Sequence, residues 1–268
     1  MLGVKASVQD VREMALLGAD FLETILFASD MKDWNTTAGG FRDGWEGPFS
    51  VHAPEYHITG RGKDLVDPVA PDPVRREEAK NTLAGTMELA RKLDAMCVLV
   101  HPGGIRPSGS DDPLPEMNDL LETFNSLERY GIPLYLENMP WFYWMDDGLR
   151  FESSFCTEPD DLKDALGSVD GILLDTCHAQ LARKEGDPGV LMDFLKLEDL
   201  IRYVHLSDAI PPDGEGLLPG KGVVPWDDVI GGIRATGAPV LPEIMDGHRN
   251  GGEKFALALE WLKENGMN

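Results

Sequence analysis

The segment GILLDTCH, residues 171–178, carries the pattern that decides how this chain folds. Its first part, Gly171–Asp175, is apolar up to the last residue, which is typical of a strand buried on both faces of a parallel sheet. The strand then ends in the carboxylate of Asp175, and His178 follows three residues later, where a loop or helix begins. An apolar strand that ends in a charged side chain predicts a polar site at the carboxyl end of a sheet.

The same combination of an apolar run and a following helical pattern recurs along the chain. The strand-like runs are Leu2–Ser7, Phe21–Phe27, Phe49–Ala53, Cys97–His101, Pro133–Asn138, Gly171–Asp175, Tyr203–Leu206 and Pro239–Ile244. Amphipathic helical stretches cover residues 8–17, 73–94, 114–130, 159–166, 188–202, 226–236 and 253–265. The gap after the second run, WNTTAGGFRDGWEG (34–47), predicts a loop with a short helical turn. Strands that alternate with helices indicate a parallel sheet, and eight such units predict an α/β protein of the (β/α)8 TIM barrel type.

Length and local signals agree with a barrel. The 268 residues suit a single domain over residues 1–268, because barrels of this kind need about 250 residues. An open doubly wound sheet would carry a glycine-rich phosphate turn after its first strand, and Ala6–Asp10 (ASVQD) is not one. Asp72-Pro73 predicts a capped helix start, and Gly237 follows a helical pattern as a C-terminal glycine does.

Composition limits the partners that we expect. The chain has 24 Lys and Arg against 47 Asp and Glu, a net charge of −23, and no basic cluster that would neutralise phosphates, which disfavours nucleic acid. No run approaches the roughly 20 apolar residues of a membrane span, and MLGVKASVQD at the start does not resemble a signal peptide. The three cysteines form no CxxC pair, which favours a reducing cytoplasm and no disulfide framework.

Six of the eight predicted strands end in a side chain that can bind a metal. These residues are His52, His101, Glu137, Asp175, His205 and Glu243. In a barrel all strand carboxyl ends meet at one face, so these distant residues should converge. Several carboxylates in one cavity raise each other's pKa unless a cation is present. Carboxylate-rich ligation with one imidazole suits Mn²⁺, Mg²⁺ or Co²⁺ better than zinc.

The single residues have less specific interpretations. His52 or His101 alone would be a satisfied polar residue of a loop, and a lone glutamate at a strand end is often a salt-bridge partner. Cys177 is interpreted as a packing residue rather than a ligand. Glu23, inside the second strand, could support the site from within the barrel.

Short motifs occur in a familiar order: LEN (136–138), DTCH (175–178), HLSD (205–208), PGKGVVPW (219–226) and PEI (242–244). Together they resemble the xylose isomerase-like superfamily of TIM barrels, over nearly the whole chain. That superfamily includes ketose 3-epimerases, other sugar isomerases and epimerases, inosose dehydratases and endonuclease IV enzymes. The order and spacing are specific to the superfamily and not to one activity.

The resemblance implies roles for particular residues. In the epimerase branch Glu137, Asp175, His205 and Glu243 would bind one metal, the two glutamates would be the acid/base pair, and His178 would contact substrate. In the endonuclease IV branch, His52, His101 and His178 would match further zinc ligands. Two departures stand out: residues 209–222 lack the Asp-x-His pair of endonuclease IV, and Ala209-Ile210-Pro211 lacks the substrate-binding arginine of many 3-epimerases.

We therefore expect a divalent-metal-dependent sugar or sugar-phosphate isomerase or epimerase that abstracts a proton next to a carbonyl through an enediolate. The alternative is an endonuclease IV-like phosphodiesterase acting on abasic DNA, and a metal-binding barrel without activity is a third possibility. The aromatic run Trp141–Trp144 would be a wall or lid over the substrate, a packed loop, or a contact in a homo-oligomer. Lys221 in PGKG would bind a substrate phosphate or be a solvated lysine.

Overall fold

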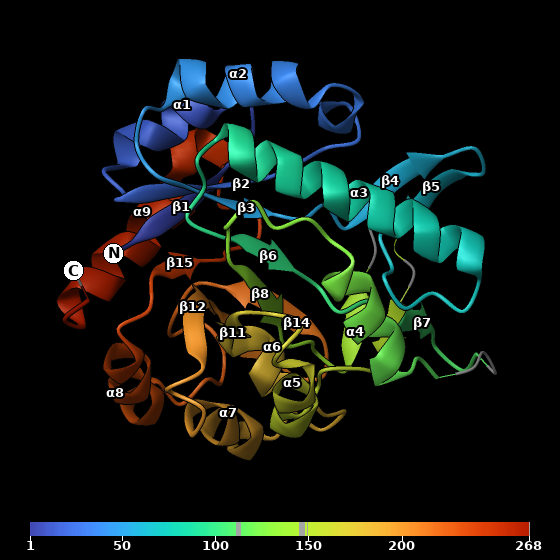
Figure 1. Cartoon of the computed structure of the whole chain (residues 1–268). Helices are drawn as coiled ribbons and strands as arrows, with labels where there is room; N and C mark the ends of the chain where they lie inside the picture. Colours follow the sequence, from blue (N-terminus) through green and yellow to red (C-terminus); the bar gives the residue numbers. More distant parts are fainter. Residues whose placement is uncertain (111–113, 145–147, 149, 268) are drawn as a thin grey trace.

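A parallel barrel sheet organises the structure, a computed structural model that describes residues 1–110, 114–144, 148 and 150–267. Its strands are β1 (Gly3–Ala6), β2 (Phe21–Thr24), β3 (Phe49–His52), β6 (Val98–Val100), β8 (Leu134–Glu137), β11 (Gly171–Asp175), β12 (Ile201–Leu206) and β15 (Val240–Pro242). Neighbours in this order pair in parallel, and a parallel bridge between Leu2 and Val240 joins the last strand to the first (Figure 1). The predicted single-domain (β/α)8 barrel is confirmed.

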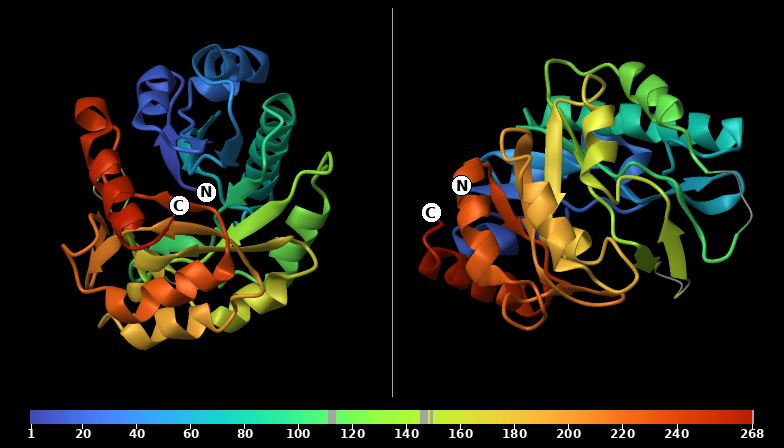
Figure 2. Two further views of the ribbon diagram at one scale, coloured as in Figure 1. Left: turned by 90° about the vertical axis from the view of Figure 1, so that its left-hand side faces the viewer. Right: turned by 90° about the horizontal axis from the view of Figure 1, so that it is seen from below.

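Helices surround the strands, as the two views of Figure 2 show. They are α1 (Val11–Met14), η1 (Ala15–Leu17), η2 (Asp30–Lys32), α2 (Trp34–Gly44), α3 (Pro73–Lys92), α4 (Met117–Asn125), α5 (Pro159–Ala165), α6 (Thr176–Gln180), α7 (Pro188–Leu195), α8 (Trp226–Thr236) and α9 (Arg249–Glu264). The predicted cap of α3 is present, because the Asp72 carboxylate accepts a hydrogen bond from the Val74 N–H at 2.9 Å. Within the described part of the chain, no helix has the length and apolar character needed to cross a bilayer.

Several predicted segments differ from the structure: the helix predicted over 114–130 spans only Met117–Asn125, and the strand predicted from Phe21 ends at Thr24. Two further differences have a clear physical reason. The sequence predicts mostly loop over residues 34–44, yet they form the helix α2, whose first turn is capped by Asp33 through the Asn35 N–H at 2.9 Å. Its paired glycines lower helix propensity, but burial of Ala38 and Phe41 against the barrel outweighs that cost. The helix predicted over 188–202 ends at Leu195, because the alternating sequence of Ile201–Leu206 pairs with β11 from Ile201 onward.

Short antiparallel sheets form the rim above the carboxyl ends of the barrel strands, and the sequence patterns did not predict them. They comprise β4 (Tyr56–Thr59) with β5 (Gly62–Leu65), β7 (Ile105–Pro107) and β9 (Phe142–Trp144) with β10 (Arg150–Ser153), and β13 (Asp208–Ile210) with β14 (Gly214–Leu217). Each is inserted after a barrel strand. These segments therefore surround any site that lies at the carboxyl ends of the barrel strands.

The inside of the barrel is layered. One compact cluster inside it consists of Phe21, Cys97, Leu99, Leu173, Tyr203 and Leu241. A larger cluster fills the space between strands and helices, and Cys177 lies in it, as the sequence interpretation expected. Because side chains alternate along a strand, the residue two positions further along each strand also points into the barrel. The apolar layer is therefore the floor of a second layer, nearer the mouth.

Candidate metal centre

This second layer is polar on every strand of the barrel. Each barrel strand, or the position directly after it, contributes one residue to this layer, two positions after the residue that the strand contributes to the layer below. The lower residues, in strand order, are Gly3, Phe21, Ser50, Leu99, Tyr135, Leu173, Tyr203 and Leu241. The upper residues, in the same order, are Lys5, Glu23, His52, His101, Glu137, Asp175, His205 and Glu243. All six residues predicted from the strand ends belong to it, so the barrel does bring them together. The strand-end rule missed Lys5, and it left Glu23 as a weak candidate. The period-two spacing from Gly3 and Phe21 is the signal that finds both.

Glu137 lies at the centre of the layer. Its carboxylate is fully buried, with Oε2 at 3.3 Å from His52 Nε2 and 3.1 Å from His101 Nε2. On the other side, Oε1 lies 3.1 Å from His178 Nδ1 and 3.6 Å from His205 Nδ1. Burial raises the pKa of Glu137, but the surrounding histidines, His101 foremost, outweigh burial and leave the pKa well below its usual range. Glu137 is therefore an anion at neutral pH.

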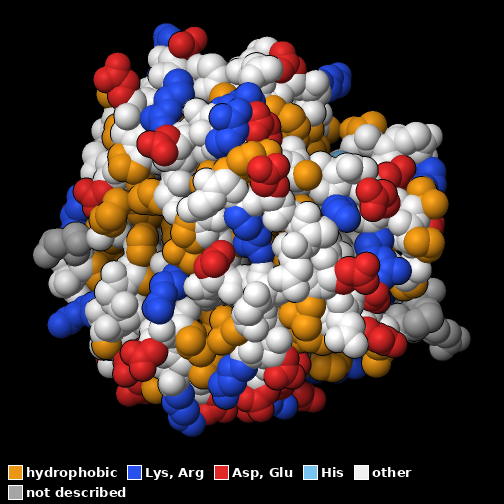
Figure 3. All heavy atoms as spheres, in the orientation of Figure 1, with side chains coloured by type: hydrophobic (Ala, Val, Ile, Leu, Met, Phe, Trp, Pro, Cys, Tyr) orange, Lys and Arg blue, Asp and Glu red, His pale blue; other side chains and the backbone are white. Residues whose placement is uncertain are grey.

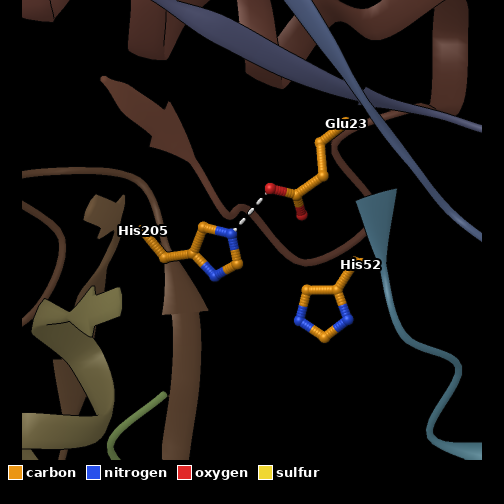
Figure 4. A group of neighbouring side chains, drawn as sticks. All are labelled: Glu23, His52 and His205. Carbon is orange, nitrogen blue, oxygen red and sulfur yellow. Dashed lines mark hydrogen bonds and ion pairs between the residues drawn. The ribbon is translucent and has the colours of Figure 1, made fainter. Parts of the chain in front are cut away.

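His205 is oriented by a partner beneath it. In Figure 4 Glu23, His52 and His205 converge from three strands, and the dashed line joins Glu23 Oε2 to His205 Nε2 at 2.9 Å. The Tyr203 hydroxyl donates to the same Glu23 oxygen at 2.7 Å. An N–H on Nε2 that donates to Glu23 leaves the lone pair of Nδ1 facing the cavity, as in metal-binding histidines held by a carboxylate.

The other ring nitrogen of His205, Nδ1, lies in a contact that a cation would stabilise. Nδ1 lies 2.5 Å from Glu243 Oε2, and both atoms are buried without a hydrogen-bond partner, as is Glu137 Oε1. With the proton on Nε2, these three atoms are all lone-pair donors facing one another. Burial lowers the pKa of His205, but Glu23 and Glu243 outweigh it, and the net pKa is raised because a proton then takes the cation's place.

Four residues around this position could together hold a metal ion, and we call them the ligand set. One donor atom from each of Glu137, Asp175, His205 and Glu243 lies within 4.8 Å of the others. Two further groups share members of the layer: Glu23 with His52 and His205, and His52 with His101 and Glu137. Three carboxylates and one imidazole fit a hard or borderline divalent ion. The residues present therefore fit a metal, and the unpartnered atoms give it a place to bind.

Asp175 closes the ligand set from β11. Its carboxylate caps α6 by accepting a hydrogen bond from the His178 N–H at 2.6 Å, and its own backbone is held by the Asn138 amide at 2.8 and 3.0 Å. Burial, with Glu243 and Glu137 adding to it, raises the pKa of Asp175 to about 7. The helix turn begun by Asp175 also directs His178 toward Glu137, which explains the spacing in DTCH.

Lys5 offsets the negative charge of Glu23 and Glu243 on the side of the layer formed by β1, β2 and β15. Its ammonium is ion-paired with Glu243 and lies 3.4 Å from Glu23 Oε1. Burial lowers the pKa of Lys5, but these two carboxylates outweigh it and the net pKa is raised. Lys5 therefore occupies one oxygen of Glu243 and leaves the other, Oε2, for the ligand set.

A cavity of about 170 Å³ lies next to these residues. Asp175, Glu243, His101 and His178 line it, together with Lys5 and Tyr143. Glu215 on β14 also lines it, and burial raises the pKa of this carboxyl group to about 7. No strand-end pattern could have found Glu215, because it comes from a rim hairpin.

Two predicted substrate-binding residues lie elsewhere. Trp141 is half-buried and does not line the cavity; the Lys184 ammonium lies 5.2 Å from the centre of its ring. Tyr143, from the same aromatic run, lines the cavity instead, and its ring lies 6.0 Å from that of His101. Lys221 is exposed in a turn and also does not line the cavity. In both cases the path of the loop, which sequence spacing does not determine, sets where the side chain points.

The PGKG motif has a structural explanation. The buried carboxylate of Asp208 accepts hydrogen bonds from the N–H groups of Ala209, Gly220 and Val224, at 2.9, 2.8 and 2.9 Å, and from Trp226 Nε1 at 3.0 Å. A Cβ on Gly222 would lie 2.2 Å from the Ala209 carbonyl oxygen, so only glycine allows this approach. The loop is thus tied to Asp208, and the glycines serve packing.

Comparison with known proteins places this site in a family. The model of the family described as xylose isomerase-like TIM barrel matches residues 14–265. The chain belongs to this family. Members of this family, and solved structures with this fold, include sugar epimerases and endonuclease IV, so the resemblance seen in the sequence is confirmed.

Individual relatives of this xylose isomerase-like barrel are distant. An uncharacterized protein of Methanocaldococcus jannaschii is 26% identical over 176 residues, 64% of this chain and 63% of that protein, so the match spans less than two thirds of its length. A D-tagatose 3-epimerase-like protein has a TM-score of 0.66 at 23% identity, covering 98% of both chains. Endonuclease IV from Thermus thermophilus has a TM-score of 0.69 at 19% identity, covering 98% of this chain and 99% of that one. At these identities the solved structures show a shared fold.

Proposed function

We propose that the chain is a divalent-metal-dependent isomerase or epimerase that acts on a sugar or a sugar-like polyol. The supporting observation is the position of Glu137 and Glu243, whose carboxylates lie 3.6 and 2.5 Å from the same atom, His205 Nδ1. Both carboxylates therefore border one ligand position beside the cavity. A reaction that removes a proton next to a carbonyl and returns one from the opposite face, as epimerisation does, uses two such groups.

In this proposal Glu137, Asp175, His205 and Glu243 hold one divalent ion, with Mn²⁺, Mg²⁺ or Co²⁺ preferred over Zn²⁺. When bound, such an ion polarises a carbonyl oxygen and makes the neighbouring C–H group more acidic. Glu23 and Lys5 fix the orientation of His205 and Glu243 from behind. Orientation matters because a carboxylate is a modest base, and its placement contributes as much as its pKa.

We assign the first proton removal to Glu243. Its side chain is 30% exposed and lines the cavity, whereas the Glu137 side chain is 1% exposed and held by histidines. Glu137 is itself an anion, so it relays a proton to the enediolate from His101, which lies 3.1 Å from it and whose pKa, lowered by burial, is raised overall by Glu137. The proton on Glu243 is then released to solvent through the cavity. Return to the same carbon gives an epimer, and return to the adjacent carbon gives an isomer. His178 and Tyr143 line the cavity where substrate hydroxyl groups would lie.

The test uses the purified, metal-loaded chain and a panel of ketoses and aldoses in ²H₂O. Proton NMR should detect loss of the C–H signal next to the carbonyl, and the Glu243→Gln variant should lose this exchange. Metal analysis should give one equivalent of Mn, Mg or Co per chain. Absence of exchange with every sugar tested, in protein with a full metal complement, would contradict the proposal.

A second candidate is a phosphodiesterase of the endonuclease IV type, and one observation favours it. His52 and His101 converge on Glu137 Oε2 and form a separate ligand group next to the first. Against it stand the net charge of −23 and the face of the molecule drawn in Figure 3, on which Lys and Arg lie scattered among Asp and Glu. Nicking of an abasic DNA duplex that disappears in the His101→Ala variant, with two or three zinc ions per chain, would make this the better function.

A further inference from the structure

The cavity at the metal centre is small for a complete substrate site. It measures about 170 Å³, whereas sites for small molecules usually measure about 300–1,000 Å³. A second hollow of about 540 Å³ adjoins it and shares Lys5, Ile25 and Glu55 with it. We call this hollow the outer groove. Besides Lys5, it is lined by residues 24–29 from the end of β2 onward, and by residues 52–56, Ile58 and Lys63 from the end of β3 onward. The two spaces are therefore neighbours that share part of their walls.

The outer groove has a polar base and an apolar rim. His52 and Thr24 lie at its base, at the ends of barrel strands. Phe27, which follows β2, and Ile58, on β4, both line it, and they are 50% and 62% exposed. Large apolar side chains that two segments expose to one hollow favour a binding surface. A sugar ring has polar edges and an apolar face, so an exposed aromatic ring above polar groups suits it.

The charges in the groove favour an uncharged occupant. Lys5 is already paired with Glu243 and Glu23, and the Lys63 ammonium lies 3.7 Å from the centre of the Tyr56 ring. Glu55 adds a negative charge to the lining. Among the described residues, no arginine lines either the cavity or the groove. A phosphate group is normally bound by charge-assisted hydrogen bonds from arginine or lysine, and here the cations are engaged.

From these observations we infer that the substrate is a keto-sugar that carries a second, uncharged sugar unit. The reacting unit lies in the cavity at the metal centre, and the second unit lies in the outer groove against Phe27. This inference rests on the proposed function, since it names the substrate class of the same site. The small size of the cavity and the position of the groove beside it, with Lys5, Ile25 and Glu55 lining both, support it.

The experiment compares D-fructose with three of its glycosyl derivatives, lactulose, maltulose and isomaltulose, and with D-fructose 6-phosphate. The metal-loaded full chain is assayed by C–H exchange in ²H₂O. We expect kcat/KM for at least one disaccharide to exceed that for fructose by about tenfold. Phe27→Ala should lower this disaccharide-to-fructose ratio about fivefold to tenfold, because stacking on the ring is lost. Ile58→Ala should lower it less.

Tyr130→Ala is the matched control, because Tyr130 is an aromatic residue that is 43% exposed and lies outside both spaces. It should leave the ratio unchanged. Equal kcat/KM values for fructose and the disaccharides would overturn the inference while leaving the proposed function intact. So would a preference for fructose 6-phosphate, or an equal effect of Phe27→Ala and Tyr130→Ala on the ratio.

A binding measurement distinguishes failure of the proposed isomerase function from failure of the inference about the groove. If no sugar shows exchange, binding of the same disaccharides and of fructose is measured by titration calorimetry on the metal-loaded chain. Disaccharide binding that is tighter than fructose binding and weakens in Phe27→Ala would retain the groove and reject the isomerase. Absence of binding by every disaccharide would reject both.

Discussion

Asp175 ends β11, and Asp208 follows the end of the neighbouring strand β12 by two residues; both are buried, and their surroundings differ. The Asp208 carboxylate accepts four hydrogen bonds from its own loop and from Trp226. The Asp175 carboxylate caps one helix turn and faces Glu137 and Glu243, and its pKa is raised to about 7. A buried acid whose lone pairs are satisfied by donors holds a loop in place. A buried acid that faces other acceptors marks a place for a cation.

The largest effect should follow from a change at the centre of the cluster. Glu137→Gln removes an anion that four histidines surround. We expect the metal content to fall below about a tenth of an equivalent, and substrate exchange to fall by about 10³-fold, the scale of lost acid–base catalysis. Metal analysis and proton NMR measure the two. Glu128→Gln, an exposed glutamate, is the control; a Glu137→Gln variant that retains its metal would contradict the ligand set.

Asp208→Ala should affect stability and not the metal. The variant loses four hydrogen bonds and leaves buried N–H groups without an acceptor, so the free energy of unfolding should drop by about 3 kcal/mol. Urea denaturation with the metal chelated measures this. Asp160→Ala, whose side chain is 87% exposed, should change it by less than about 0.5 kcal/mol. If folded Asp208→Ala protein lost its metal, it would be wrong to assign Asp208 to loop stability and Asp175 to metal binding.

The raised pKa of Asp175 predicts how metal binding depends on pH. Below about 7 the folded, metal-free chain holds a proton on Asp175, and a metal ion has to displace it. Affinity for Mn²⁺ should therefore fall at least tenfold per pH unit below 7. Because the raised pKa of His205 keeps a second proton on the site, the affinity should continue to rise above pH 7, with a smaller slope. Calorimetry at pH 5.5, 6.5 and 7.5 checks this, with Glu215→Gln as a control that keeps the slope.

The raised pKa of Asp175 also predicts that the stability of the metal-free chain falls with rising pH, whereas metal affinity rises. Unfolded Asp175 ionises near pH 4, and folded Asp175 near 7, so the folded state binds more protons in between. The contribution of Asp175 to stability should therefore decrease as the pH rises through this window. A metal-free chain whose stability rises over the same interval in the wild type but not in Asp175→Asn would contradict the assignment.

The smallest effect should come from Lys221. Because this side chain is exposed and does not line the cavity, Lys221→Ala should change kcat/KM by less than about twofold, and metal content not at all. A loss of tenfold or more for a phosphorylated sugar would show that Lys221 reaches the substrate after all, and that the PGKG loop has a role beyond packing on Asp208.

Much of the barrel and of the metal cluster could be predicted from the sequence. The eight apolar runs and their polar ends recur in order, and barrel closure brings strand ends to one face whatever the loops do. The residues that were missed or misplaced come from two sources. Lys5 and Glu23 lie inside strands, where a rule based on strand ends does not look. Glu215 and Trp141 lie on rim segments whose path depends on tertiary contacts.

The sequence by itself determined the eight βα units and the convergence of Glu137, Asp175, His205 and Glu243, because both follow from strand periodicity and from the geometry of a closed parallel sheet. Only the tertiary structure decided which polar groups are satisfied. It gave Asp208 four donors, left Glu137, His205 and Glu243 with unpartnered atoms, and placed the outer groove beside the cavity. Hydrogen-bond satisfaction depends on distances of a few tenths of an ångström between segments far apart in the chain, and no local pattern encodes them.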